Sequence, residues 1–401
     1  MKEKLKIEFL PEGSITSPQG FYAAGIHAGI KSDNSKDMAL IVSENPSVTA
    51  AAFTTCKFSA APVIISKSIL AKNNFIRAVL INSGNANACT GKQGINNCIE
   101  QIEEIARLLN IHRDEVLICS TGRIGIQLPM PKIKKGIQQL SSYLSRAGGK
   151  DAAEAIMTTD TKPKSVAVRI NLNGKYVTIG GIAKGAGMIA PKLQPLHATM
   201  IACITTDVQI SPALLNKAFI SSVNHSFNRI TVDGDTSTND TVLCLANGAS
   251  KVLIEQNSRS YSHFRRALRT VMEYLSKELV KDAEGATKLI TVIVKHAKTV
   301  SQAKNCAFTI ANSLLCKTAW FGSDPNWGRI LAAAGRSSAD FLPNNVNLFY
   351  DNLPVVKNGI DAGTPEKLLK DILDKNEFSV ILDLNTGNAS YSVLTSDISY
   401  E

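Results

Sequence analysis

One segment near the middle of the chain combines residue types that suit covalent catalysis. It reads Lys184-Gly185-Ala186-Gly187-Met188-Ile189-Ala190-Pro191, and Ala198-Thr199-Met200 follows shortly after. Glycine and proline at this density exclude a helix interior and make a poor strand. The apolar run at 200–204 is typical of a buried strand. The sequence therefore predicts a loop that presents the Thr199 hydroxyl at the edge of a core strand.

Thr199 can act as a nucleophile if it becomes the first residue of a chain. Its own α-amine, with an ordinary pKa of about 7.7–8.0, then serves as the base. That terminus requires cleavage between Ala198 and Thr199: the hydroxyl attacks the Ala198 carbonyl, and water hydrolyses the resulting ester. Such a step needs a polarised carbonyl. The plainer interpretation is a threonine that merely begins a strand, where β-branched residues are common.

Two further sites have the chemistry to assist such a nucleophile. Thr121-Gly122 ends a predicted strand and can present a hydroxyl and an unhindered N–H to an oxyanion, although an ordinary exit from a strand has the same composition. The Lys184 segment lacks the GxxxxGK[ST] order of a phosphate loop. We therefore interpret Lys184 as a cation that binds a substrate carboxylate.

The other polar candidates are less specific. Glu284 lies between small residues and either pairs with a substrate amine or is a solvated loop carboxylate. Asp233, Asp235 and Asp240 do not have the spacing of an EF-hand, so we expect an internally hydrogen-bonded loop and no metal. The six histidines include His197 beside the nucleophile, but none lies in a GxSxG, HExxH or Cys-His signature.

Strand and helix patterns surround these sites. Apolar and β-branched runs predict strands at 38–43, 50–54, 75–81, 114–119, 165–172, 176–182, 200–207, 242–245, 289–294, 378–384 and 389–394. Helical spacing predicts helices at 95–109, 130–144, 150–157, from 212, from 261, at 301–315, beyond 329 and at 365–373. Asn173-Gly174 predicts a hairpin that leads into the central loop. Because strands both alternate with helices and pair directly, we expect an α/β (α+β-like) fold of layered sheets flanked by helices.

Composition excludes several functional classes. The 401 residues carry a net charge of +10, but the basic residues are dispersed and aromatics make up only 6%, which argues against nucleic-acid binding. The eight cysteines form no CxxC pair and are typical of buried thiols in a reducing compartment. Neither a signal peptide nor a run of about 18 apolar residues is present, so we expect a cytoplasmic protein with no membrane partner.

Long motifs spread over nearly the whole chain resemble the ornithine acetyltransferase family, the bifunctional glutamate N-acetyltransferases of arginine biosynthesis. The motifs are Asn82-Ser83-Gly84-Asn85-Ala86-Asn87-Ala88-Cys89-Thr90-Gly91, Ser120-Thr121-Gly122, Met157-Thr158-Thr159-Asp160-Thr161, the central segment through Thr199, the stretch 226–241, Glu284-Gly285-Ala286-Thr287-Lys288 and Asp324-Pro325-Asn326-Trp327-Gly328-Arg329. Their number and order make chance similarity an inadequate explanation.

The resemblance implies an N-terminal-nucleophile enzyme that cuts itself at Ala198-Thr199. The α chain (1–198) and the β chain (199–401) are then intertwined rather than independent. It also implies ping-pong transfer of acetyl from N-acetylornithine to L-glutamate through an acetyl ester on Thr199. By the same match, Thr121 and Gly122 form the oxyanion hole. The substrate-binding residues that it implies are Thr158 or its neighbour Thr159, Lys184, Thr199 and Glu284.

The resemblance leaves other properties as expectations. We expect no cofactor; some members of the family also use acetyl-CoA to acetylate glutamate, and the residues do not decide whether this chain does. The expected assembly is an α2β2 heterotetramer. Two alternatives are an N-terminal-threonine amidohydrolase or peptidase on the same scaffold, and an impaired paralogue, since the family has a short tail beyond the residue that corresponds to Glu401.

Overall fold

The computed structural model describes residues 5–172, 174–190 and 200–399, which form two compact units. The first unit comprises Met1–Asn228 and Thr236–Leu279, and the second comprises Arg229–Asp235 and Val280–Glu401. This division concerns packing and does not follow the expected cut between 198 and 199. That cut lies outside the described residues, so the α and β chains stay a prediction.

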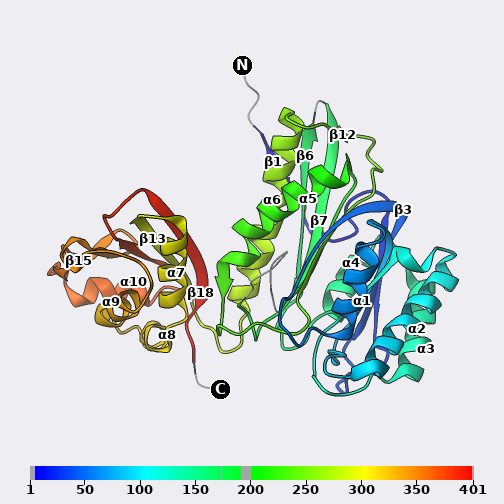
Figure 1. The fold of residues 1–401 in the computed structure, drawn as a ribbon, viewed down its shortest axis with the longest axis horizontal. Coiled ribbons are helices and arrows are strands. Elements are labelled where there is room, and N and C mark those ends of the chain that lie inside the picture. Colours follow the sequence, from blue (N-terminus) through cyan, green and yellow to red (C-terminus); the bar gives the residue numbers. More distant parts are fainter. Residues whose placement is uncertain (1–4, 173, 191–199, 400–401) are drawn as a thin grey trace. The chain divides into compact units, whose positions relative to one another are not determined.

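A large mixed sheet forms the centre of the first unit (Figure 1). Its described strands run in the order β1-β6-β7-β8-β11-β3-β4-β5, and β2 pairs with β3. Their bounds are β1 (Ile7–Phe9), β2 (Phe21–Ile26), β3 (Met38–Phe53), β4 (Phe75–Asn82), β5 (Val116–Ser120), β6 (Lys164–Leu172), β7 (Lys175–Lys184), β8 (Ile201–Thr206) and β11 (Thr241–Ala246). A separate small sheet pairs β9 (Gln209–Ile210) with β12 (Leu253–Ile254).

Strand β8 is central to this sheet and buried along its whole length. It pairs antiparallel with β7 and parallel with β11. A strand covered on both faces has little need for polar residues, which explains the apolar run that the sequence shows here. The predicted hairpin is also confirmed, because β6 and β7 pair antiparallel from Lys164↔Ala183 to Leu172↔Lys175.

Helices cover both faces of the large sheet. One face packs in a single core with α1 (Ala61–Leu70), α2 (Gly91–Leu109), α3 (Met130–Tyr143) and α4 (Gly149–Ala155), and Ile182 of β7 belongs to that core. The neighbouring Gly181 faces Val271 and Leu275 of α6 (Arg259–Lys281). Since successive strand residues point to opposite faces, α6 covers the other face.

Helix α5 (Pro212–His225) begins where the sequence predicts. The Ser211 hydroxyl accepts a hydrogen bond from the Leu214 N–H over 3.4 Å, and Pro212 is the first helical residue. Serine as N-cap followed by proline is a common helix start, because that proline's missing N–H would have had no helical partner.

The second unit is a mixed sheet with helices on one face. Its described strands run in the order β10-β18-β13-β17-β14-β15-β16. Their bounds are β10 (Ile230–Thr231), β13 (Leu289–Ala297), β14 (Asn347–Tyr350), β15 (Leu353–Lys357), β16 (Ile360–Asp361), β17 (Glu377–Asp383) and β18 (Ala389–Ser396). The helices α7 (Val300–Ala311), α8 (Leu314–Phe321), α9 (Trp327–Gly335) and α10 (Glu366–Leu373) share one core with alternate residues of these strands.

The expected layered α/β fold is therefore confirmed, with local differences. The two predicted strands at 38–43 and 50–54 are one strand, β3, whose pairing with β4 shifts register between Val42 and Ser47. The helix predicted at 301–315 ends at Ala311, and α8 begins after Ser313. In the described part of the chain, all eight cysteines are free thiols, and six of them are buried. No described helix is long and apolar enough to span a bilayer.

Candidate functional site

The end of β5 fixes Thr121 at one edge of the large sheet. Strand β5 lies parallel to β4, and its last residue, Ser120, donates a 2.6 Å hydrogen bond to the side chain of Asn82. The Thr121 N–H donates to the Asn82 carbonyl over 2.9 Å. Two bonds to the last residue of the neighbouring strand therefore hold the backbone of Thr121 in place.

Gly122 occupies a position that only glycine fits. Its φ is 126°, and a Cβ there would lie 2.4 Å from the carbonyl carbon of Gly84 and 2.6 Å from the nitrogen of Asn85. No described residue accepts a hydrogen bond from the Gly122 N–H. The tight packing explains the amide-rich loop after β4, and the unengaged N–H has the property that an oxyanion donor requires.

Lys184, the last residue of β7, reaches Thr121. Its Nζ donates to the Thr121 hydroxyl oxygen over 3.2 Å, and the lysine is only 5% exposed. Because the ammonium donates to this oxygen, the hydroxyl proton of Thr121 stays available for another acceptor. Lys184 also pairs with Ile201, the first residue of β8, so the site lies beside the start of that strand.

Asp160 connects the remaining parts of the site. One carboxylate oxygen accepts from Lys164 Nζ (2.6 Å) and from the Gly185 N–H (2.7 Å), and the other accepts from the Thr158 N–H (3.0 Å). Burial raises the pKa of Asp160, but the charges of Lys184 and Lys164 and the Gly185 N–H outweigh it, so this pKa lies below its ordinary value. The carboxylate thus holds the loop of Thr158 against the end of β7.

Glu284 lies in the second unit, in the turn between α6 and β13. The Asp397 carboxylate accepts from the N–H groups of Thr287 (2.8 Å) and Lys288 (2.9 Å), which fixes this turn. Lys288 Nζ donates to the Trp320 carbonyl over 2.6 Å. The Glu284 side chain is exposed and has no hydrogen-bond partner among the described residues.

The structure brings four predicted site residues together within the first unit: Thr121, Gly122, Thr158 and Lys184. Glu284 belongs to the second unit. Ala198 and Thr199, with His197 before them, lie outside the described residues. Their continuation is described, since the Thr241 N–H donates to the Met200 carbonyl over 2.8 Å where β11 and β8 begin.

A family model described as the ArgJ family matches residues 22–401. The chain belongs to the ArgJ family. It is 45% identical over 395 residues to an arginine biosynthesis bifunctional protein ArgJ of Caldanaerobacter subterraneus subsp. tengcongensis, covering 97% of this chain and 96% of that protein. A glutamate N-acetyltransferase of Methanocaldococcus jannaschii is also 45% identical, over 399 residues, with 97% and 96% covered.

Two similar solved structures are shorter chains than this one. An ornithine acetyltransferase from Mycobacterium tuberculosis, crystallised with ornithine, is 41% identical, with 47% of this chain and 100% of that chain covered and a TM-score of 0.44. An ArgJ from Bacillus halodurans is 40% identical, with 48% and 100% covered and a TM-score of 0.45. The family resemblance that the motifs indicate is thus confirmed by sequence identity along the chain.

Sequence reasoning missed two polar residues of this site and predicted the wrong surroundings for a third. Asp160 was recognised only as part of a motif, although its carboxylate joins Thr158, Lys164 and Gly185. Asn239 donates to the carbonyls of Ala86 (2.6 Å) and Ser120 (2.8 Å), and so anchors the segment before Thr121. Asp240, the third, was expected to lie in an internally hydrogen-bonded loop. It is buried beside Asn239, and its carboxyl oxygens have no hydrogen-bond partner among the described residues, so that prediction is wrong at this residue. The sequence feature that could have indicated Asn239 and Asp240 is the dense run of small polar residues at 233–240.

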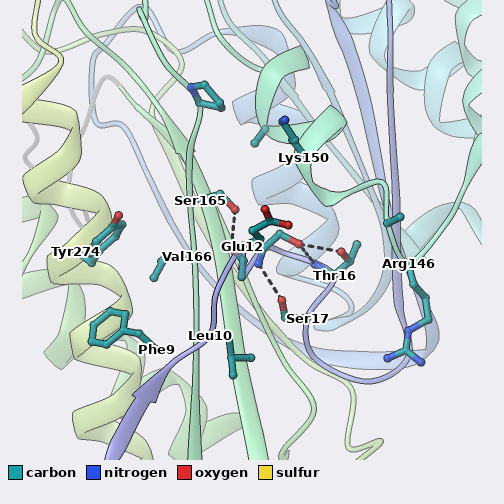
Figure 2. Close-up of a pocket in the computed structure, with 15 residues that line it drawn as sticks. Phe9, Leu10, Glu12, Thr16, Ser17, Arg146, Lys150, Ser165, Val166 and Tyr274 are labelled. Carbon is teal, nitrogen blue, oxygen red and sulfur yellow. Dashed lines mark hydrogen bonds between the residues drawn. The ribbon is translucent and has the colours of Figure 1, made fainter.

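A separate cavity of about 740 Å³ lies in the first unit and contains none of the predicted site residues (Figure 2). Figure 2 shows Phe9 and Tyr274 on one side of it and the charged groups of Glu12, Lys150 and Arg146 across from them. The ring centroids of Phe9 and Tyr274 are 6.1 Å apart. The hydroxyls of Ser14 and Thr16 bond to each other (2.9 Å), and that of Ser165 donates to the Gly13 carbonyl (2.9 Å), so these groups are already paired.

Proposed function

We propose that this protein is a glutamate N-acetyltransferase that moves acetyl from N-acetylornithine to L-glutamate. The observation that carries the proposal is the cluster of Thr121, Gly122, Lys184 and Asp160 beside the start of β8, in a chain that belongs to the ArgJ family. Self-cleavage between Ala198 and Thr199 precedes the reaction and gives Thr199 a free α-amine.

The chemistry takes two steps. The Thr199 hydroxyl attacks the acetyl carbonyl of N-acetylornithine and its α-amine takes the proton. The C–N bond then breaks, and the α-ammonium gives that proton to the departing nitrogen of ornithine. The amine of glutamate next attacks the acetyl ester and gives a proton to the α-amine, which passes it to the Thr199 oxygen as the ester C–O bond breaks. In both steps, negative charge develops on the carbonyl oxygen. The Thr121 hydroxyl and the Gly122 N–H are the donors that stabilise it.

The charges of the remaining site residues indicate which substrate groups they bind. Lys184 binds a carboxylate of the amino-acid substrate, and Thr158 lies on the same side because Asp160 holds both segments. We propose that Glu284, in the second unit, pairs with a substrate amine.

The pairing of strands supports an assembly in which the two chains stay together after cleavage. Strand β8 of the β chain pairs with β7 of the α chain, and β11 of the β chain pairs with β3. We propose an α2β2 heterotetramer in the cytoplasm that needs no cofactor, with acetyl-CoA as an alternative acetyl donor to be tested.

Intact mass and a transfer assay test this function. Wild-type protein should purify as two fragments cut at Ala198-Thr199, and Thr199→Ala should purify as one chain without transfer activity. Wild-type protein should transfer acetyl from N-acetylornithine to glutamate, and the assay with acetyl-CoA in place of N-acetylornithine decides between one activity and two. A Thr199→Ala protein that is still cut would refute the mechanism, and acetate release without glutamate would favour an amidohydrolase.

A further inference from the structure

The loop between β2 and β3 folds around the carboxylate of Asp37, which is fully buried. Its two oxygens accept hydrogen bonds from the N–H groups of four consecutive residues: Ala28 (2.6 Å), Gly29 (3.0 Å), Ile30 (2.6 Å) and Lys31 (3.0 Å). Hydrogen bonds to an ionised acceptor are stronger than neutral ones, so these four fix the backbone of the loop. The loop therefore presents the side chain of Lys31 from a defined position.

The ammonium of Lys31 joins this loop to the segment that carries Thr158. Its Nζ donates to the carbonyl of Met157 over 2.8 Å and to the carbonyl of Lys36, within the loop, over 2.9 Å. The Met157 carbonyl and the Thr158 N–H belong to one planar peptide unit, and this N–H donates to Asp160 over 3.0 Å. Lys31 and Asp160 thus hold the two edges of the same peptide plane. Together they fix its orientation, and with it the direction in which the Thr158 side chain leaves the backbone.

The aliphatic stem of Lys31 packs against Gly84. A Cβ on Gly84 would lie 3.0 Å from Lys31 Cγ and 3.3 Å from Ile30 Cγ2. Gly84 in turn packs against the proposed oxyanion donor, since a Cβ on Gly122 would lie 2.4 Å from the Gly84 carbonyl carbon. Lys31 therefore contacts one part of the site through its stem and another through its ammonium.

The surroundings of Lys31 keep their own partners when its charge is removed. Burial lowers the pKa of Lys31, and the carboxylates of Asp33, Asp37 and Asp160 oppose that fall. Asp37 has its four N–H donors, and Asp160 is paired with Lys164 at 2.6 Å. A neutral side chain at position 31 thus leaves both buried carboxylates with donors, and we expect such a variant to fold.

We propose that Lys31 is a positioning residue for acetyl transfer, an inference that rests on the proposed function. Its ammonium holds the peptide between Met157 and Thr158 in the orientation that directs the Thr158 side chain to the substrate. Its stem supports the backbone of Gly84, against which Gly122 packs. The two contacts are separable, because methionine keeps an unbranched stem and loses the ammonium, whereas alanine loses both.

The kinetic test compares Lys31→Met, Lys31→Ala and Lys31→Arg. Lys31→Met should raise the KM for N-acetylornithine about ten-fold, because a charge-assisted hydrogen bond to the Thr158 segment is lost. Its kcat should stay within about two-fold of the wild type, as expected when binding is lost equally in the ground and transition states. Lys31→Ala should also lower kcat about ten-fold, because the oxyanion donor shifts with Gly84. Lys31→Arg should recover part of the KM, since arginine keeps the charge and the donors.

Lys132→Met is the matched control. Lys132 Nζ donates to the Gly29 carbonyl of the same loop over 2.7 Å, so this variant removes a lysine bond from the loop and leaves the one to Met157. Its KM and kcat should equal those of the wild type. A KM that rises as much in Lys132→Met as in Lys31→Met would show that the loop as a whole, not Lys31, is responsible.

Amide hydrogen exchange tests the positioning without any activity. In Lys31→Met, the Thr158 amide should exchange faster than in the wild type and in Lys132→Met, because its peptide is held at one edge only. Unchanged exchange at Thr158, or a loss of kcat in Lys31→Met without a rise in KM, would overturn the proposal. Wild-type protein that transfers no acetyl would instead reject the proposed function, and that result needs no Lys31 variant.

Discussion

At the scale of single residues, the site depends on groups whose hydrogen bonds are directed away from the reacting position. Lys184 donates to Thr121 Oγ1, which leaves the hydroxyl proton of Thr121 available, and the N–H of Gly122 has no described acceptor. Neither donor has to break an existing hydrogen bond when an oxyanion forms, so the two donors are preorganised for it.

Gly122→Ala tests this arrangement. The new Cβ would lie 2.4 Å from the Gly84 carbonyl carbon, so the loop must shift and carry the Gly122 N–H away. Misplacing one oxyanion donor should lower kcat by about 10²–10³-fold. Gly125→Ala is the matched control, because Gly125 also has positive φ (84°) but no atom within 4 Å of the added Cβ. Equal losses of transfer activity in both variants would show that backbone strain, not the oxyanion position, is responsible.

Some of these residues were predictable from the sequence, and others were not. Thr121, Gly122 and Lys184 were predictable because each ends a strand beside small residues or in a glycine-rich segment. Asn239 was not, because what distinguishes it is which distant backbone groups it contacts: it donates to the carbonyls of Ala86 and Ser120, more than a hundred residues away in sequence. Side-chain contacts at such separations depend on strand order, which periodicity does not determine.

At the scale of elements, the site is assembled where strand ends meet. The ends of β5 and β7 and the beginnings of β8 and β11 supply its groups, and Asp160, in the segment between α4 and β6, joins them. Its carboxylate is paired with Lys164, and both side chains are fully buried. Removing one partner from such a pair leaves an uncompensated buried charge.

Asp160→Asn should therefore destabilise the first unit by about 3–5 kcal/mol and reduce transfer, because Thr158 and the end of β7 lose their common anchor. Since the pKa of Asp160 lies below its ordinary value, its stabilising contribution is present above about pH 4 and disappears as pH falls through the lowered pKa. Urea unfolding at several pH values measures this. The variant should lose less stability than the wild type on acidification.

Glu273→Gln is the control for that measurement. Glu273 forms an exposed helix-surface pair with Arg269, and such pairs contribute little to stability. An Asp160→Asn protein as stable as Glu273→Gln, with the pH dependence of the wild type, would contradict the role of Asp160 as the anchor.

The element predictions failed where local composition and long-range pairing disagree. Asn45-Pro46 predicts a break, but β3 continues through it by shifting register against β4. The run at 301–315 has helical spacing throughout, yet α7 ends at Ala311 because Asn312 caps it and Ser313 begins the next helix. Strands β14, β15 and β16 were missed, since they are short and bounded by turn residues. Tertiary pairing overrides local propensity in such segments.

At the scale of the whole molecule, the proposed cut lies in the chain between β7 and β8, two strands that pair in one sheet of the first unit. The first unit contains residues from both sides of Thr199, and β8 lies between β7 and β11. Six residue pairs join β7 to β8, and six join β3 to β11. Cleavage removes one covalent bond but leaves both ladders, together with the buried side chains on either face.

The cut protein should therefore behave as one folded body. On size exclusion in native buffer, the α and β chains should elute together at the volume of the uncut Thr199→Ala protein. They should separate only at the urea concentration at which circular dichroism shows the sheet to unfold, because neither chain can leave while β8 remains paired. Chains that separate in native buffer would mean that the ladders between β7 and β8 and between β3 and β11 are too weak to hold the site. The substrate groups of the two chains would then have no common scaffold.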